Sequence, residues 1–342
     1  MMDFFTIELT DLRRWMQENG YQPFQAEQIF DWVYEKGATD WGSMTNLGAP
    51  IREALAKAFR LATLKPKQHR ESPDGVQKVT WALVDGSLTD TVLTPSRQGW
   101  HLTMSTQVGC PVGCAFCASG KRFVRNLQPA EVFEQFLRAR QWVREQGTKE
   151  IITVGLDGMG EPLKHVKGLL AVLDGFIRVG FSPNKITIPT IGLIEGIEQL
   201  LQLKVRLNLK VGLHAPTQIL RQKLVPYAKK NRLEALMTVC RRYSMQTGLP
   251  VTFDYVMIAG VNDHPDQALE LAHLLKHLRC QVRLIPYNPV QGFRWQTPDK
   301  RAIKAFRTVL FGSKIPNSLI EDPGVAISAG LGQLAPRTNT ER

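Results

Sequence analysis

Cysteine is scarce in this sequence, with five residues among 342. A secreted scaffold held together by disulfides needs a higher density of cysteine in a shorter chain, so that class is excluded. Acidic residues are also fewer than basic ones. The 31 Asp and Glu against 43 Lys and Arg give a formal net charge of +12. This excess indicates a polyanionic partner, most simply a nucleic acid, but does not identify any chemistry.

Long hydrophobic runs are absent as well. The best apolar segment, residues 168–177, is interrupted by Asp174 and is shorter than the roughly 20 residues that cross a bilayer. The N-terminus has an early Asp3, no basic start and no cleavage site of small residues, so it does not resemble a signal peptide. We therefore expect a cytoplasmic protein without a membrane partner. Its 43% hydrophobic and 22% charged residues exclude disorder as the main state.

The first part of the chain differs in pattern from the rest. Helical periodicity over residues 9–19, 23–34 and 50–61 predicts a small helical N-terminal domain over residues 1–62. Its many aromatic side chains indicate the core of a small bundle, with an RNA-contacting surface as the alternative interpretation. Residues 63–98 are predicted to form a basic linker followed by a β-hairpin, because Asp85-Gly86 separates strand-like runs at 76–83 and 88–94.

From residue 99 to 312, strand-like runs alternate with helices. The six strand candidates are residues 101–108, 150–156, 185–191, 205–213, 251–258 and 281–287. The intervening helices are predicted at 128–145, 163–179, 193–202, 231–246, 264–279 and 298–310. This alternation predicts an α/β fold with a parallel sheet, either doubly wound or an incomplete barrel. Residues 313–342 are then a C-terminal extension.

Three cysteines, Cys110, Cys114 and Cys117, follow the first predicted strand of this region. Three thiolates within eight residues are suited to hold three irons of a [4Fe–4S] cluster, which leaves the fourth iron open for a reactive ligand. A zinc site with His101 as fourth ligand and three inert buried thiols are the alternatives. Cys240 and Cys280 are expected to be buried and structural.

Other polar and glycine-rich segments also follow predicted strands. Residues 157–162 follow the second strand, 212–216 the fourth and 288–289 the sixth. The carboxyl ends of parallel strands meet at one rim, where ligands bind in such folds. The glycines permit close approach of a ligand, and Glu161 offers an acceptor for an ammonium group. We therefore expect one site at this rim.

The cysteine loop with Phe116 resembles the signature of the radical S-adenosylmethionine (SAM) superfamily. Further segments resemble the RlmN/Cfr family, which methylates adenosine in large-subunit rRNA and in tRNA; they are residues 107–110, 126–127, 158–162, 213–216, 255–257, 261–263, 284–289 and 332–334. The resemblance covers nearly the whole chain. It implies an incomplete (β/α)6 radical-SAM barrel as the core.

The resemblance also implies roles for individual residues. The three cysteines would hold a [4Fe–4S] cluster whose open iron chelates SAM, and the SAM-contacting positions are Gly160, Glu161, Gly212, Leu213, His214 and Asn288. Asp90 matches an acidic position, usually Glu, that accepts a proton in the family, whereas Pro189 stands where the family has a serine. An external one-electron reductant such as flavodoxin or ferredoxin, and a monomer, are expected.

Two further cysteines of the family are missing. The cysteine that carries the methyl group is replaced by Leu331, and the cysteine that resolves the RNA adduct is replaced by Met104. Neither side chain can act as a thiolate, and no cysteine follows Cys280. Three hypotheses remain. The chain is an RNA methyltransferase with a modified mechanism, a radical SAM enzyme with non-methylating chemistry, or a non-catalytic RNA-binding paralogue.

Basic side chains near the predicted site fit an RNA substrate. They follow the cysteine loop and the fourth unit, at Lys121, Arg122, Arg125, Lys229, Lys230 and Arg232. Runs of charge more often form a solvated face, which is the alternative interpretation. An RNA enzyme of this kind would take a base from a loop into a pocket.

Overall fold

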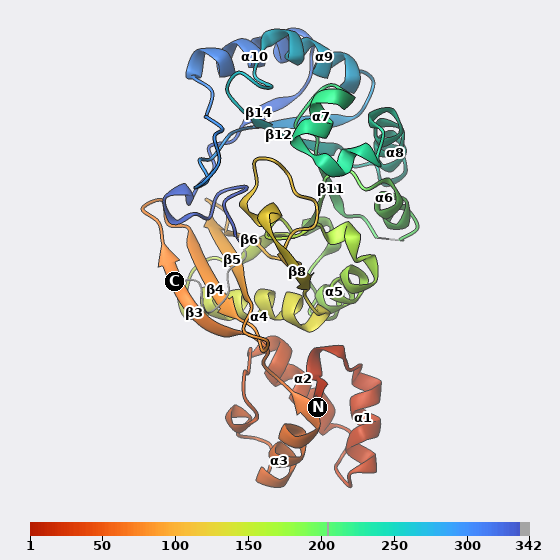
Figure 1. Ribbon diagram of the computed structural model, residues 1–342. Coiled ribbons are helices and arrows are strands. Elements are labelled where there is room, and N and C mark those ends of the chain that lie inside the picture. Colours follow the sequence, from red (N-terminus) through yellow and green to blue (C-terminus); the bar gives the residue numbers. More distant parts are fainter. Residues whose placement is uncertain (204, 336–342) are drawn as a thin grey trace.

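The computed structural model describes residues 1–203 and 205–335. Its centre is a ten-stranded sheet with the order β14-β13-β12-β11-β10-β9-β6-β5-β4-β3 (Figure 1). The strands from β6 to β14 pair in parallel and form the core of the α/β fold. They are β6 (Trp100–Thr103), β9 (Ile151–Gly155), β10 (Ile186–Thr190), β11 (Asn208–Gly212), β12 (Val251–Met257), β13 (Cys280–Pro286) and β14 (Asn317–Leu319).

The parallel core confirms the predicted α/β fold and extends it. The strand predicted at 101–108 is divided into β6 and β7 (Gln107–Gly109), and β7 pairs with β8 (Phe123–Asn126) in a separate two-stranded sheet. The short strand β14 was not predicted, because only three residues of the C-terminal extension pair with β13. The sheet does not close, since β3 and β14 lie at its two ends.

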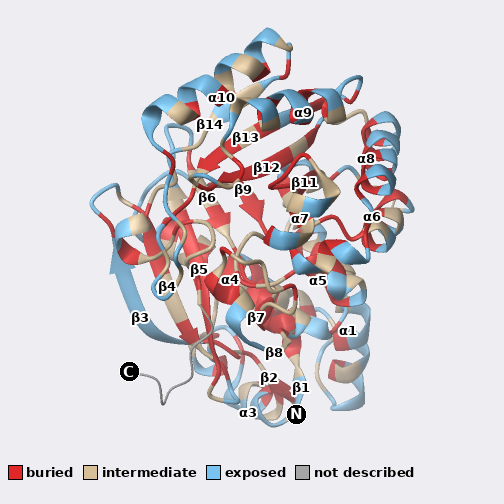
Figure 2. Cartoon of the chain, turned by 45° about the horizontal axis from the view of Figure 1, so that its top comes forward, coloured by how far each residue is buried: buried red, intermediate tan, exposed pale blue. Residues whose placement is uncertain are grey.

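Six helices occupy the predicted positions between the parallel strands. They are α4 (Pro129–Glu145), α5 (Val166–Arg178), α6 (Ile194–Leu201), α8 (Leu233–Thr247), α9 (Pro265–Leu275) and α10 (Lys300–Gly312). Each buries one apolar side against the sheet, and the parallel strands are buried (Figure 2). The short helix α7 (Gln218–Leu224) was not predicted. No described helix is long and apolar enough to cross a membrane.

The hairpin is confirmed, but the basic linker before it is not a linker. β4 (Gln77–Ala82) and β5 (Leu88–Pro95) are antiparallel, and Gly86 between them has a φ of 82°. Residues 65–71 form β3 (Lys65–Glu71), whose residues are all exposed at the sheet edge (Figure 2). Its side chains show no apolar alternation because neither face is covered. The charged side chains of β3 instead suit a strand at the edge of the sheet, which has a partner strand on one side only.

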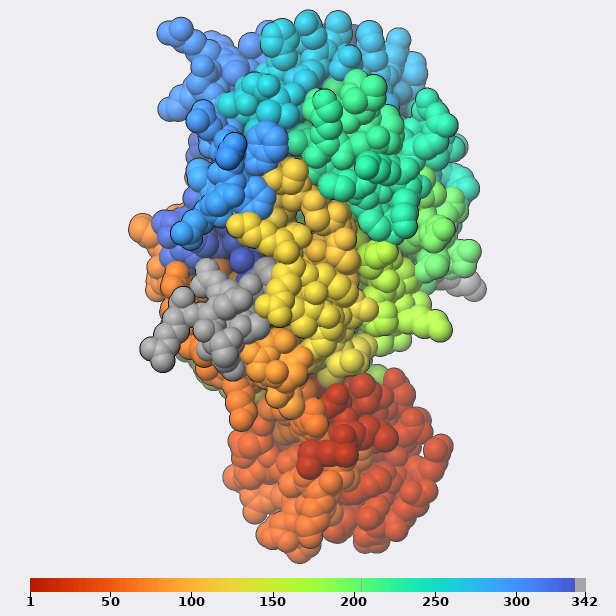
Figure 3. Space-filling model, viewed as in Figure 1, coloured from red at the N-terminus to blue at the C-terminus, as the bar shows by residue number. Residues whose placement is uncertain are grey.

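The N-terminal residues form a separate helical unit at the end of the molecule (Figures 1 and 3). It contains α1 (Leu9–Glu18), α2 (Gln25–Phe30), which continues as a π-helical turn, and α3 (Ala49–Ala58), while β1 (Met2–Asp3) pairs with β2 (Phe59–Arg60). Phe4 is fully buried, with its ring 5.4 Å from Trp41 and 5.9 Å from Phe59. Most of the aromatic side chains therefore form the core of this unit, as predicted.

Hydrogen bonds fasten this unit to the barrel helices. Arg178 of α5 donates to the carbonyl of Ile7 at 3.0 Å and to the Tyr34 hydroxyl at 3.1 Å. Glu134 of α4 accepts from the backbone and hydroxyl of Thr63, both at 2.6 Å.

Of the predicted C-terminal extension, residues 336–342 lie outside the described part of the chain.

Candidate functional site

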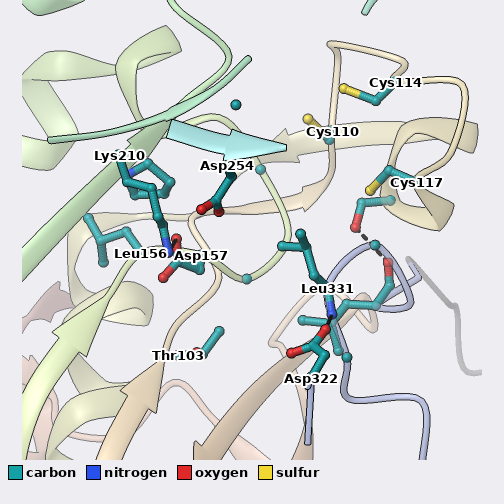
Figure 4. Close-up of a pocket in the computed structure, with 18 of the residues that line it drawn as sticks. Thr103, Cys110, Cys114, Cys117, Leu156, Asp157, Lys210, Asp254, Asp322 and Leu331 are labelled. Atoms are coloured by element: carbon teal, nitrogen blue, oxygen red, sulfur yellow. Dashed lines mark hydrogen bonds and ion pairs between the residues drawn. The ribbon is translucent and has the colours of Figure 1, made fainter. Parts of the chain in front are cut away.

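A cavity of about 440 Å³ lies at the carboxyl ends of the parallel strands. The predicted SAM and cluster residues that line it are Cys110, Cys114, Cys117, Gly160, Glu161, Gly212 and His214. Figure 4 shows the three cysteines at one side of this cavity. The structure therefore brings together three of the four strand-end segments expected at one rim. The lining does not include Leu213, which is fully buried, nor Asn288.

The cysteine loop is held in place by backbone contacts to distant segments. The Ala115 N–H donates to the carbonyl of Leu224 at 2.9 Å, and the Ala118 N–H donates to that of Gly332 at 2.7 Å. The loop begins at Gly109, which has a φ of 76° and whose backbone lies so close to Arg122 that a Cβ atom would come within 1.8 Å of its carbonyl oxygen. Only glycine fits this position without movement of the backbone.

The three cysteines lie in the cavity wall and are partly buried. Burial raises the pKa of Cys110 to about 12 and that of Cys114 and Cys117 above the usual value, so these thiols need a bound cation to become thiolates. Among residues 1–203 and 205–335, no three His, Cys, Asp or Glu side chains converge closely enough to hold a single ion. A [4Fe–4S] cluster places each sulfur on a different iron, so three separated thiols suit it better than zinc.

Glu161 is buried in the wall of this cavity. Its carboxylate accepts from the backbone N–H groups of Ile191 at 2.7 Å and Leu163 at 3.2 Å, while its own N–H donates to Gln107 at 2.9 Å. Burial raises the pKa of Glu161 to about 7, although these backbone hydrogen bonds oppose the rise. The preceding Gly160 has a φ of 122°. The carboxyl group is thus close to ionisation at neutral pH and suits a cationic ligand group.

His214 is held in a single orientation as a neutral ring. The Val256 N–H donates to its Nδ1 at 3.1 Å, and Asn262 donates to its carbonyl at 2.8 Å. Burial, together with the positive charge of Arg221, lowers the pKa of His214 to about 3. The Phe116 ring of the cysteine loop contacts the imidazole edge-on, with 4.8 Å between the ring centroids. His214 therefore offers a neutral Nε2 rather than a charge.

The C-terminal segment closes one side of the cavity. Leu331 lines it, and the Leu331 N–H donates to Asp322. The Asn288 amide donates to the same carboxylate at 2.7 Å and to the carbonyl of Leu331 at 3.2 Å. Asn288, predicted as a SAM contact, thus holds the turn at Leu331. Figure 3 shows the cysteine-loop region, in yellow, beside the C-terminal segment, in blue.

Two other predicted positions lie away from the cavity lining. Asp90 on β5 is buried, with Lys78 Nζ at 3.2 Å and the Thr80 hydroxyl donating to it at 2.6 Å. Met104 is fully buried. Asp90 therefore belongs to a polar pair of the hairpin in this structure. Of Met104 and Leu331, the two positions predicted to have lost a family cysteine, only Leu331 lines the cavity.

Ionisable side chains form a further set on the wall of the same cavity. The sequence pointed to only two of its members, His101 as an alternative zinc ligand and Asp157 within the strand-end segment 157–162, and did not reveal the other four. We call this set the charged belt, and its members are His101, Asp157, Lys210, Asp254, Arg283 and Asp322. Figure 4 shows Lys210, Asp157 and Asp254 grouped apart from the three cysteines. The available signal was the presence of single charged residues, such as Lys210, within otherwise apolar strands.

Within the charged belt, Lys210 of β11 pairs with Asp157, which follows β9 two strands away, and Arg283 of β13 pairs with Asp254 of the neighbouring β12. Lys210 Nζ lies 2.7 Å from Asp157 Oδ1, and Arg283 Nε lies 3.4 Å from Asp254 Oδ1. Burial opposes ionisation of Asp157, but the charge and hydrogen bond of Lys210, together with the charges of His101 and Arg283, outweigh it and lower the pKa of Asp157. Burial raises the pKa of Asp254, for which the cations do not compensate fully. The cavity therefore carries charge of both signs.

The comparisons with known proteins agree with this geometry. Residues 2–61 match the family "Ribosomal RNA large subunit methyltransferase N-terminal domain", and residues 104–272 match the "Radical SAM superfamily". The chain is 43% identical over 339 residues to the "Probable dual-specificity RNA methyltransferase RlmN 2" of Protochlamydia amoebophila, covering 98% of this chain and 94% of the relative. It is 36% identical to the "Dual-specificity RNA methyltransferase RlmN" of Desulfosudis oleivorans, covering 94% and 87%.

A solved structure has the same fold over nearly its whole length. The crystal structure of a radical SAM methyltransferase from Sphaerobacter thermophilus superposes with a TM-score of 0.94 at 35% identity, covering 98% of this chain and 99% of that one. Together with the three-cysteine loop and the cavity behind it, these matches confirm the resemblance found in the sequence. The chain belongs to the RlmN family of radical SAM methyltransferases.

Proposed function

We propose that this protein is a radical SAM RNA methyltransferase that acts on an adenosine of rRNA or tRNA, with its [4Fe–4S] cluster held by Cys110, Cys114 and Cys117. The observation that supports this most directly is that the three thiols share one cavity with Glu161 and His214. The cofactors of a radical SAM family member are this cluster and SAM. Bound there, they supply a deoxyadenosyl radical, and the protein's residues orient SAM and exclude water.

SAM would lie between the cysteine loop and the strand ends. Glu161 would accept hydrogen bonds from the SAM ammonium group. Gly160 and Gly212 line the same cavity, and a Cβ atom there would come within 2.5 Å of the Thr106 hydroxyl and 2.6 Å of His214 Nε2. The neutral His214 offers a hydrogen bond without repelling the sulfonium charge. Leu213 and Asn288 act indirectly, Leu213 by packing and Asn288 by holding the turn at Leu331.

The methyl-transfer step must differ from the cysteine route of the family. A leucine at position 331 faces the cavity where that route needs a nucleophilic sulfur, and Met104 is buried outside it. This observation favours a second candidate function, a radical SAM enzyme with non-methylating chemistry. The charged belt gives that candidate additional weight, because it supplies polar groups on the inner wall of the cavity.

The RNA and the reductant are also part of the proposal. The net charge of +12 and the N-terminal unit suit binding of an RNA backbone. Not all the basic side chains predicted for this role are available, because Arg125 forms ion pairs with Asp85 and Glu131. An external one-electron reductant of the flavodoxin or ferredoxin type would supply electrons to a cytoplasmic monomer.

Anaerobic reconstitution with iron, sulfide, SAM and a reductant tests the cofactor assignment. We expect iron–sulfur absorbance and formation of 5′-deoxyadenosine, both lost in Cys114→Ser and both retained in the matched control Cys240→Ser, whose thiol is buried in α8. An absence of 5′-deoxyadenosine from the wild-type protein would contradict both candidate functions. Cluster absorbance retained by Cys114→Ser would contradict the ligand assignment.

The substrate is tested in cells. Nucleoside mass spectrometry of rRNA and tRNA from wild-type and deletion strains should show one modified adenosine that disappears in the deletion strain. If 5′-deoxyadenosine forms in the reconstituted protein but no methyladenosine differs between the strains, the non-methylating candidate replaces the first.

A further inference from the structure

Arg221 of helix α7 is a buried cation without an anionic partner. Its side chain is 0% exposed, and it is among the largest fully buried side chains of the described residues. Its Nη2 group donates to the carbonyl of Ile191, and to that of Gly212 at 3.3 Å. Nε and Nη1 have no hydrogen-bond partner, and no carboxylate forms an ion pair with Arg221 among residues 1–203 and 205–335.

Such an arrangement destabilises a folded protein. An ionised group removed from water loses its hydration, and a protein normally compensates with an opposite charge and a full set of hydrogen bonds. Arg221 donates hydrogen bonds to only two backbone carbonyls, both from Nη2, and its other two nitrogens have no acceptor. Ordinary packing would be served better by an apolar side chain, so the charge itself requires an explanation.

The position of Arg221 points to the cysteine loop. The end of α7 is fastened to this loop, because the Leu224 carbonyl accepts from the Ala115 N–H at 2.9 Å, and Ala115 directly follows Cys114. Arg221 itself does not line the cavity, but the two carbonyls to which it donates belong to Ile191 and Gly212, which both line it.

The electrostatics of the cofactor complement this buried charge. A [4Fe–4S] cluster with three thiolate ligands is negative overall and gains a further negative charge when it is reduced. In a low-dielectric surrounding, a nearby cation stabilises the reduced form more than the oxidised form, which raises the reduction potential. Reduction must precede SAM cleavage in this superfamily, so the potential matters for the reaction.

We propose that Arg221 is the buried counter-charge of the cysteine-held cluster and raises its reduction potential. It would act through its charge and not as a ligand, since its side chain does not line the cavity. The proposal concerns the cofactor alone and is independent of the RNA and of the product.

A neighbouring thiol gives the main competing explanation. Cys240 of α8 is fully buried and interacts electrostatically with Arg221, so a Cys240 thiolate would be an alternative counter-ion. Burial raises the pKa of Cys240 to about 12, which keeps this thiol neutral at physiological pH. Cys240→Ser is therefore the matched control, because it removes that thiol and leaves the charge of Arg221 in place.

The test is a redox titration of the full-length, anaerobically reconstituted protein without SAM or RNA, followed by absorbance and electron paramagnetic resonance. Arg221→Met has a similar length without charge, Arg221→Gln keeps a donor for the carbonyls, and Arg221→Lys keeps the charge. We expect the midpoint potential of both neutral variants to shift to more negative values at equal iron content. Arg221→Lys and Cys240→Ser should stay near the wild-type potential.

Other outcomes also decide the question. Neutral variants that load iron fully and keep the wild-type potential would overturn the proposal. A shift in Arg221→Lys as large as that in Arg221→Met would assign the effect to hydrogen bonding and overturn the role of charge. If the neutral variants have the wild-type circular dichroism spectrum but fail to retain the cluster, while Arg221→Lys retains it, the counter-charge role is supported. A missing RNA product would affect only the proposed function.

Discussion

Replacing Lys210 with methionine removes one half of an ion pair that faces the cavity. Lys210 Nζ lies 2.7 Å from Asp157 Oδ1, and the two side chains are 8% and 10% exposed. Methionine has nearly the same length and fills the same space, so the change removes charge with little change in packing. What remains is a buried carboxylate that has lost its nearest cation.

The expected cost follows from the distance and the burial. Coulomb's law with an effective dielectric constant of about 20 gives an attraction of about 6 kcal/mol at this distance. Desolvation of both groups offsets much of that, and removal of one partner from a buried pair typically costs about 3–5 kcal/mol. We expect a loss in this range for Lys210→Met. The double variant Asp157→Leu/Lys210→Met should recover most of the stability, because no unpaired charge remains.

Urea unfolding at matched cluster content measures this loss, and pH provides an independent check. Lys210 lowers the pKa of Asp157 below its unfolded value of about 3.9, so the stabilisation is present above that pH and is lost as pH falls through the folded pKa. In Lys210→Met the remaining burial raises the pKa, so protonation relieves the penalty in acid. The wild-type advantage should therefore shrink toward about pH 4. A loss under about 1 kcal/mol at pH 7, or a loss independent of pH, would refute the reasoning.

Three further perturbations test the site. Gly109→Ala should lose cluster loading and lower the free energy of unfolding by about 3 kcal/mol or more, because its Cβ atom would meet the Arg122 carbonyl at 1.8 Å. In the control Gly147→Ala, which is also at positive φ but has no atom within 4 Å, thermal unfolding should show a loss of only about 1 kcal/mol. SAM affinity measured by calorimetry should rise as pH increases through about 7, where Glu161 ionises, and a similar rise in Glu161→Gln would contradict this assignment. Leu331→Cys places a thiol in the cavity, and peptide mass spectrometry should detect SAM-dependent methylation there; an unmodified thiol in a protein that produces 5′-deoxyadenosine would show that this position does not receive a methyl group.

Much of this protein can be recognised from short segments of its sequence. The cysteine loop needs only eight residues to present three sulfurs, and Asp85-Gly86 is sufficient to predict the hairpin because its turn favours a positive φ. The helical unit and the alternation of strands and helices follow from local periodicity in the same way. These features are determined within one turn or one element, so they do not depend on the rest of the fold.

The tertiary structure decided which side chains meet. The basic run at 65–71 is a strand only because β4 offers it an edge, and Asp90 is paired with Lys78 because the hairpin register places them together. The charged belt depends on which face of each strand points inward, which no single strand reveals. In the sequence, nothing distinguishes Arg221 from an ordinary basic residue of a short helix, and only the packing of the fold shows that it is removed from water. The sequence by itself thus determined the cofactor loop and the family. Burial and cross-strand register, which arise from contacts between residues far apart in the chain, decided the charges that surround that loop.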